Sequence, residues 1–107
     1  MSLTYFAMDR AAGELDFFDT EQAAFDYAAE TLKEYRRDAR ADGEWSLDVE
    51  DVTVGVVPVG VTQQAARDDD RLLCVTHRAK AIGNKKMGYD YRMCLKASAE
   101  LTDEVQK

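Results

Sequence analysis

Apolar residues near the start of the chain form two short segments separated by a turn signal. Residues 3–8 (LTYFAM) are aromatic and apolar, which favours a first strand. Gly13 follows as a turn residue, and residues 15–18 (LDFF) predict a second strand. Because the connection between them is short, the two strands are expected to pair as a hairpin.

A helical period replaces this pattern from residue 20 to residue 41. Its apolar residues recur at steps of three and four, which predicts one long amphipathic helix; they are Ala24, Ala28, Leu32, Tyr35 and Ala39. Asp19 is expected to cap the N-terminus of this helix, with Gln22 in the capping-box position. Gly43 is expected to end it in the left-handed conformation.

Residues 52–57 return to a strand pattern that is dense in valine, which predicts a buried strand. Gly55 removes a side chain in the middle of this strand, and that indicates a bulge or a close approach by the helix. Pro58 cannot donate a ladder hydrogen bond, so it marks an edge or a break. Residues 59–62 are expected to extend the strand beyond it.

The segment from residue 63 to residue 82 is less regular. Residues 63–70 are polar and predict a loop. Residues 71–82 fit two patterns. As a helix, the segment has an apolar stripe of Leu72, Val75, Ala79 and Ile82; as a strand, residues 72–76 have an ordinary β composition. The helix is favoured by a narrow margin.

Residues 83–88 predict a loop, and the most regular strand pattern of the chain follows it. One face of this strand would carry Tyr89, Tyr91, Met93 and Leu95, and the other Asp90, Arg92, Cys94 and Lys96. Such alternation predicts one buried and one solvated face. Ser98 is expected to begin a short C-terminal turn.

The element order β–β–α–β–(α)–β predicts an α+β fold. We expect a small antiparallel or mixed sheet of about four strands, with the long helix on one face and a second short helix. The length of 107 residues suits one domain, residues 1–107. Its folded core is expected over residues 1–97, and residues 98–107 form a short C-terminal turn or a frayed tail.

Composition narrows the class of protein. Hydrophobic residues make up 46% and charged residues 33% of the chain, which is typical of a globular protein. The longest apolar run, residues 54–61, is far shorter than the roughly 20 residues that span a bilayer, so no membrane association is expected. The N-terminus lacks the basic segment of a secretion signal, and two cysteines suit a reducing compartment, so we expect a cytoplasmic protein.

The net charge of −7 is unevenly distributed along the chain. Residues 1–60 contain 14 acidic and 5 basic residues, whereas residues 61–107 contain 7 acidic and 9 basic residues. Such an asymmetry bears on the partners of a protein and not on its fold. It predicts one surface that suits a basic partner and another that suits an acidic one.

The sequence contains no catalytic or cofactor motif. Cys74 and His77, with Cys94 and Asp90 elsewhere, would make an incomplete zinc site, because structural zinc usually takes two pairs of closely spaced ligands. With a single histidine, the chain also gives no support for a Cys–His nucleophile. We therefore expect no enzyme activity, no metal and no cofactor.

Two candidate partner-binding surfaces remain. The acidic one consists of Asp42, Glu44, Trp45, Asp48, Glu50 and Asp51. Tryptophan is a common anchor of protein interfaces, although Trp45 would equally close the core beneath the helix end. The alternative surface is basic and consists of Arg71, Arg78, Lys80, Lys85, Lys86, Arg92 and Lys96. It would bind nucleic acid through phosphate contacts, but its neighbouring tyrosines alternate with the basic residues and so face the other way.

Three motifs resemble those of small bacteriophage-encoded accessory proteins. They are the acidic turn of residues 42–45 (DGEW), the strand of residues 49–56 (VEDVTVGV) and, more weakly, residues 90–93 (DYRM). The resemblance covers about the first 57 residues and carries over no catalytic residue. It implies a protein that binds and inhibits a host protein or complex in the host cytoplasm, of the anti-CRISPR or another anti-defence kind. Homodimerisation through an open sheet edge is a further arrangement that the sequence allows.

Overall fold

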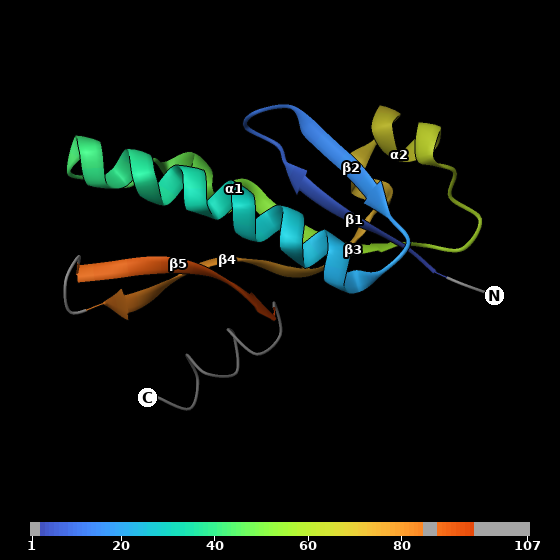
Figure 1. The fold of residues 1–107 in the computed structure, drawn as a ribbon. Helices are drawn as coiled ribbons and strands as arrows, with labels where there is room; N and C mark the ends of the chain where they lie inside the picture. Colours follow the sequence, from blue (N-terminus) through green and yellow to red (C-terminus); the bar gives the residue numbers. More distant parts are fainter. Residues whose placement is uncertain (1–2, 85–87, 96–107) are drawn as a thin grey trace, which may run out of the picture.

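A single antiparallel sheet organises the chain, with strands in the order β2–β1–β3–β4–β5. The computed structural model describes residues 3–84 and 88–95. Within them the strands are β1 (Thr4–Asp9), β2 (Glu14–Phe18), β3 (Val52–Val57), β4 (Cys74–Asn84) and β5 (Gly88–Leu95). Helix α1 (Glu21–Asp42) crosses one face of this sheet (Figure 1). The predicted α+β class is confirmed, with five described strands where about four were expected.

Helix α1 begins and ends at residues with distinct capping roles. Thr20, and not Asp19, is the N-cap, since its hydroxyl accepts a hydrogen bond of 3.1 Å from the Ala23 N–H. At the other end Gly43 has φ 84°, and its N–H donates to the Ala39 carbonyl over 2.8 Å. The predicted left-handed glycine cap is therefore confirmed, and the predicted N-cap is wrong by one residue.

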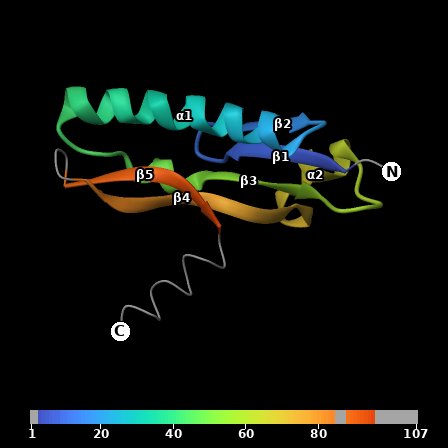
Figure 2. The same ribbon diagram turned by 60° about the horizontal axis from the view of Figure 1, so that its bottom comes forward.

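Two apolar cores lie on opposite faces of the sheet, because side chains alternate along each strand. The core under α1 contains Ala7, Ala24, Ala28, Leu32, Ala39, Trp45, Val49, Val52, Val54, Ala79 and Tyr91. The core on the other face contains Phe6, Met8, Val57, Ala66 and Leu73. A short helix, α2 (Gln63–Asp68), contributes Ala66 to this second core, and Leu73 follows directly after the 3₁₀ turn η2 (Asp70–Leu72). Figure 2 shows α1 as a separate layer along the sheet.

The preference for a helix over residues 71–82 is wrong, since residues 74–84 form β4. This strand pairs with β3 on one side and β5 on the other, so its backbone hydrogen bonds are made to neighbouring strands and not within a helical turn. The supposed apolar stripe is divided between the two faces of the sheet: Val75 packs in the second core and Ala79 in the core under α1.

Gly55 lies where the register between β3 and β4 shifts, which confirms the predicted bulge. The close approach is made by the next strand and not by the helix. A Cβ at Gly55 would meet the Cys74 carbonyl oxygen at 2.0 Å and Phe6 Cε1 at 2.8 Å. Strand β3 ends at Val57, so the predicted extension over residues 59–62 is wrong.

The polar segment predicted as a loop contains α2, because Thr62 caps it by accepting a hydrogen bond of 3.0 Å from the Ala65 N–H. At the far edge of the sheet, the α1-facing side of β5 includes Tyr91, which is buried, and Met93, which is partly buried. This agrees with the predicted alternation. The predicted turn at residues 98–107 lies outside the described residues. Within those residues no helix has both the length and the apolar character required to cross a membrane.

Arginine side chains bond to backbone carbonyls on both edge strands. On β5, Arg36 from α1 donates to the Tyr91 carbonyl over 3.3 Å and forms an ion pair of 2.9 Å with Asp90. On β2, Arg67 from α2 donates to the Leu15 carbonyl over 2.9 Å and lies over the Phe17 ring. Unpaired carbonyls on an edge strand are a template for another strand, so these contacts protect both edges.

Candidate functional site

The acidic residues between α1 and β3 form an exposed group at one end of the molecule. Asp42 is the last residue of α1 and Glu44 follows its cap, and Asp48 and Glu50 lie on the 3₁₀ helix η1 (Leu47–Asp51). All four are exposed, and within the described chain none of their carboxylates forms an ion pair. By contrast, Asp70 and Asp90 are each paired with an arginine.

Trp45 does not belong to this exposed surface. Its side chain is only 8% exposed and packs edge-on against Tyr91, with ring centroids 5.1 Å apart. The structure therefore places Trp45 in the core beneath the end of α1, where it closes the space between the helix and β5. The apolar residue that this end does expose is Leu47, at 82%. In η1 the Val49 side chain points into the core, and Leu47 points to solvent.

Four of the carboxylates and Leu47 are referred to below as the acidic end: Asp42, Glu44, Leu47, Asp48 and Glu50. Leu47 was not among the predicted site residues, because a lone leucine between polar residues carries no periodic signal. The fifth predicted carboxylate, Asp51, lies on the other side of the sheet. It is partly buried and lines a cleft with two arginines, described below.

The predicted basic surface is only partly assembled by the fold. Arg71 lies on η2 and pairs with Asp69 over 2.9 Å. Arg78, Lys80 and Arg92 lie on the sheet face opposite α1, with Lys80 and Arg92 as direct cross-strand partners. The remaining three, Lys85, Lys86 and Lys96, lie outside the described residues. We call Arg78, Lys80 and Arg92 the basic strip.

The basic strip consists of cationic side chains that suit contacts with phosphates, and not of aromatic rings that stack on bases. Tyr91, the aromatic residue next to it in sequence, packs under α1 on the other face. Like charges placed directly opposite each other on neighbouring strands destabilise a sheet. An anionic partner would relieve the repulsion between Lys80 and Arg92.

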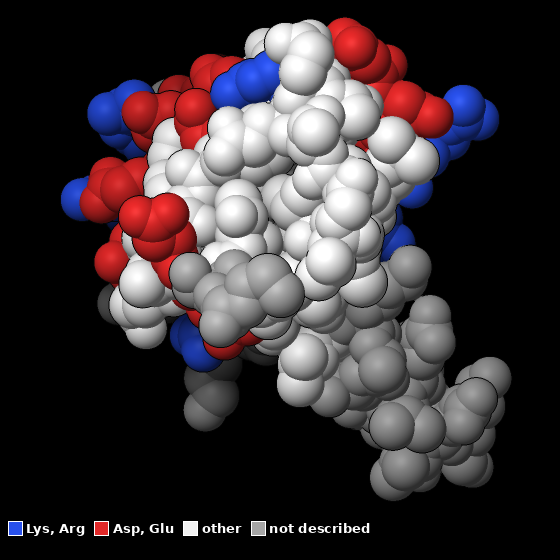
Figure 3. Space-filling view, turned by 90° about the vertical axis from the view of Figure 1, so that its right-hand side faces the viewer, with Lys and Arg blue, Asp and Glu red and all other residues white. Residues whose placement is uncertain are grey.

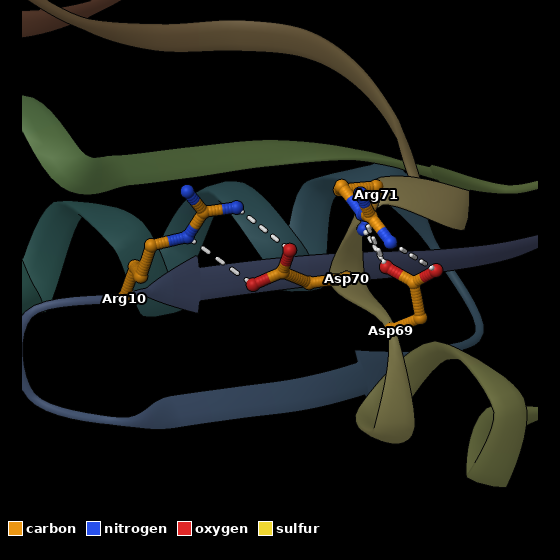
Figure 4. Close-up of polar contacts among 4 residues, drawn as sticks. All are labelled: Arg10, Asp69, Asp70 and Arg71. Carbon is orange, nitrogen blue, oxygen red and sulfur yellow. Dashed lines mark hydrogen bonds and ion pairs between the residues drawn. The ribbon is translucent and has the colours of Figure 1, made fainter.

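A cleft of about 150 Å³ opens on the same sheet face, next to Arg78. It is lined by Met8, Arg10, Asp51, Thr53, Val75 and Arg78. Arg10 is held at its rim by Asp70, which accepts hydrogen bonds of 3.1 Å from Nε and 2.7 Å from Nη2 (Figure 4). Figure 4 also shows the Arg71–Asp69 pair as a separate contact, formed within η2 and its cap.

Thr53 is the unusual residue of this cleft. It is 7% exposed, and its Oγ1 atom is buried without a hydrogen-bond partner among the described residues. Leaving a buried hydroxyl unsatisfied costs about 1–3 kcal/mol. Arg10 and Thr53 were not among the predicted site residues, because their proximity to Arg78 depends on strand register and not on sequence spacing.

Two tyrosines of α1 anchor the first hairpin through carboxylates. Burial, together with the 2.8 Å hydrogen bond that Tyr35 donates to Asp9, raises the pKa of Tyr35 well above its usual value. The 2.7 Å hydrogen bond to Glu14, together with burial, does the same to the pKa of Tyr27. Both hydroxyls therefore stay protonated and act as fixed donors, which is a structural role.

The cysteines and the histidine do not assemble into a catalytic or metal site in the described part of the chain. Cys74 is exposed. His77 packs edge-on against Phe25 of α1 at 4.6 Å, and its Nδ1 lies 2.8 Å from the Thr76 hydroxyl. Among the described residues no group of three or more His, Cys, Asp or Glu side chains is arranged to hold a metal ion.

The opposite end of the molecule differs from the acidic end. Figure 3 shows this end, which carries the N-terminus and α2, with an uncharged centre and charged side chains along its rim. The charge of the protein is therefore concentrated on particular surfaces.

Comparison with family models, with curated proteins and with solved structures finds no match for this chain.

Proposed function

We propose that this protein acts without catalysis, by binding a basic surface of a host protein or complex through the acidic end. The observation that carries the proposal is the group of exposed carboxylates that have no cation partner in the described chain, placed around the exposed Leu47. Complementary charge steers the encounter of two proteins and limits the choice of partner. Leu47 supplies an apolar contact that becomes buried on binding.

The resemblance to phage accessory proteins supports an inhibitory role in the host cytoplasm, of the anti-CRISPR or another anti-defence kind. Complexes that hold nucleic acid expose basic channels, because they must neutralise phosphates. An acidic protein that covers such a channel would compete with the nucleic acid. Occupation of the channel, without any covalent chemistry, would be sufficient for inhibition.

A comparative capture experiment tests this proposal. The wild type and a neutralised variant, D42N/E44Q/D48N/E50Q, are used as bait in host lysate, and captured proteins are identified by mass spectrometry. A control variant, D19N/E30Q/E34Q/D38N, removes the same number of exposed carboxylates from the start and the outer surface of α1. We expect one partner to be captured by the wild type and the control variant, but not by the neutralised variant.

Two further measurements make this test specific. Capture of the partner should weaken as salt is raised, because exposed charges are screened beyond about 10 Å at 0.1 M ionic strength. Substitution of Leu47 by Ala should accelerate dissociation without changing the circular dichroism spectrum. If the neutralised variant captures the same partner as the wild type, the acidic end is not the binding surface.

A second candidate function, nucleic-acid binding, is favoured by the like-charged Lys80–Arg92 pair on the open sheet face. Gel-shift titrations with single- and double-stranded DNA and RNA at several salt concentrations test it. A binding constant that falls steeply with salt, and that is lost in K80Q/R92Q, would support this function. The absence of any shift at low salt would exclude it.

A further inference from the structure

The pairing register of three strands, β1, β3 and β4, brings together residues that line the cleft beside Arg78. Thr53 on β3 has Met8 of β1 as its partner on one side and Arg78 of β4 on the other. Directly opposed residues have Cβ atoms about 4.5–5.5 Å apart and share a face. Met8, Thr53 and Val75 therefore line the cleft on the sheet face opposite α1, and Arg78 lines it beside them.

The charged rim of the cleft is completed at the ends of β1 and β3. The last pair of that ladder is Asp9 with Val52, so Arg10 and Asp51 are the next residues on either side. Asp70 occupies Nε and Nη2 of Arg10, which leaves Nη1 available. Asp51 forms no ion pair with Arg10 or Arg78, although all three line the same cleft.

These groups define a ligand by its complementary chemistry. Two guanidinium groups favour an oxyanion. Asp51, when ionised, can only accept a hydrogen bond, so it repels an oxyanion oxygen that has no proton. The volume, about 150 Å³, is several times the roughly 30 Å³ that one water molecule occupies in the liquid, which leaves room for a tetrahedral oxyanion.

We propose that this cleft binds a phosphate group that retains one proton, either as inorganic phosphate or as a singly protonated monoester. Arg78 and Arg10 bind the charged oxygens, and the P–OH group donates to Asp51. Sulfate at neutral pH carries no proton and is rejected by Asp51. A phosphodiester carries none either, so this site differs from a surface for the nucleic-acid backbone, and it is independent of the function proposed for the acidic end.

The proposal is tested by calorimetric titration of the full chain at pH 7 and constant ionic strength. The probes are inorganic phosphate, sulfate, methyl phosphate and dimethyl phosphate. We expect saturable binding of inorganic phosphate with one site per chain, and at least tenfold weaker binding of sulfate and dimethyl phosphate. Methyl phosphate should bind more tightly as the pH falls towards 6, where more of it carries a proton.

Variants of the rim separate this site from a general effect of salt. R78Q should weaken phosphate binding at least tenfold, and R37Q, which removes an exposed arginine of α1, should leave it unchanged. D51N should narrow the difference in binding affinity between phosphate and sulfate, because an amide can donate a hydrogen bond to an unprotonated oxygen. T53V should raise the melting temperature, because it removes a buried hydroxyl that has no hydrogen-bond partner among the described residues.

Several results would overturn the proposal. One is equal binding of phosphate and sulfate by the wild type; another is binding of phosphate by R78Q with wild-type affinity. If R78Q does not fold, R78K retains the charge but loses the planar fork, and it is expected to bind phosphate several-fold more weakly. Dimethyl phosphate binding as tightly as inorganic phosphate would assign the cleft to a phosphodiester and refute the role of Asp51.

Discussion

Substitution of Gly55 by Ala introduces one methyl group at the closest approach between β3 and β4. The new Cβ would lie 2.0 Å from the Cys74 carbonyl oxygen and 2.8 Å from Phe6 Cε1. The Phe6 ring can shift slightly, but the Cys74 oxygen belongs to the backbone of a paired strand. Relief of the contact therefore requires the two strands to separate locally.

The magnitude follows from the cost of overpacking. Extra methyl groups in a packed core cost about 1–3 kcal/mol, and a backbone obstacle places this site at the upper end. Alanine also stabilises the folded state by about 0.5–1 kcal/mol relative to glycine, because glycine loses more conformational freedom when a strand forms. We expect a net loss of about 2–3 kcal/mol, which corresponds to a melting temperature lowered by roughly 10–20 °C in a domain of this size.

Urea unfolding followed by circular dichroism measures this effect. G13A is the control, because Gly13 has φ 70° but no atom within 4 Å of its added Cβ; the cost there is limited to about 1–2 kcal/mol of backbone strain. The double variant F6L/G55A should not recover the stability lost in G55A, because the Cys74 carbonyl remains in place. A free energy of unfolding for G55A within 1 kcal/mol of the wild-type value would refute this reasoning.

Three other features yield predictions. Replacing both edge arginines, R36A/R67A, should increase the share of concentration-dependent dimers or larger species relative to the wild type, as measured by size-exclusion chromatography with light scattering, whereas R37A should match the wild type. Burial opposes ionisation of Asp90, but hydrogen bonds from Arg36 and from the Tyr91 N–H hold its pKa below the ordinary 3.8. The ionised form therefore stabilises the fold above that pH. D90N should lower the free energy of unfolding at pH 7 by about 1–3 kcal/mol, and the difference should vanish as the pH falls below 3.8; a constant difference down to pH 2 would contradict this. W45A should cost about 3–5 kcal/mol in urea unfolding, the usual loss for a buried aromatic residue, and a near-neutral effect would mean that Trp45 is not part of the core.

The sequence predicts those elements whose signals are local. The stripe of α1 and its glycine cap depend on residues within a few turns of one another, and both are confirmed. The short strands β1 and β2 are likewise indicated by composition and a turn residue. Strand β4 was misassigned because its apolar residues Val75, Ala79 and Ile82 fall at helical steps, although Val75 and Ala79 lie on opposite faces of the sheet. That spacing imitates a helix, and only the partner strand reveals it.

The candidate sites show the same division between local and long-range information. The exposed carboxylates were found because they are close in sequence. Of the two alternatives for Trp45 the structure shows the core position, and the exposed Leu47 was not predicted. The cleft could not be predicted, since Arg10, Thr53 and Arg78 come together only through the pairing of three strands.

The different lengths of the strands have a consequence for the motions of the protein. β4 spans 11 residues, but only its first part, as far as Arg78, pairs with β3; beyond that it pairs with β5 alone. A two-stranded ribbon is marginally stable by itself. Arg36 of α1, and Trp45 from the segment that follows this helix, hold the ribbon through their contacts with Tyr91. We expect the amide protons of the overhanging ribbon to exchange with solvent as one cooperative unit, earlier than those of β1 and β3. Each opening would expose Trp45 to solvent, so its fluorescence would report local opening before global unfolding.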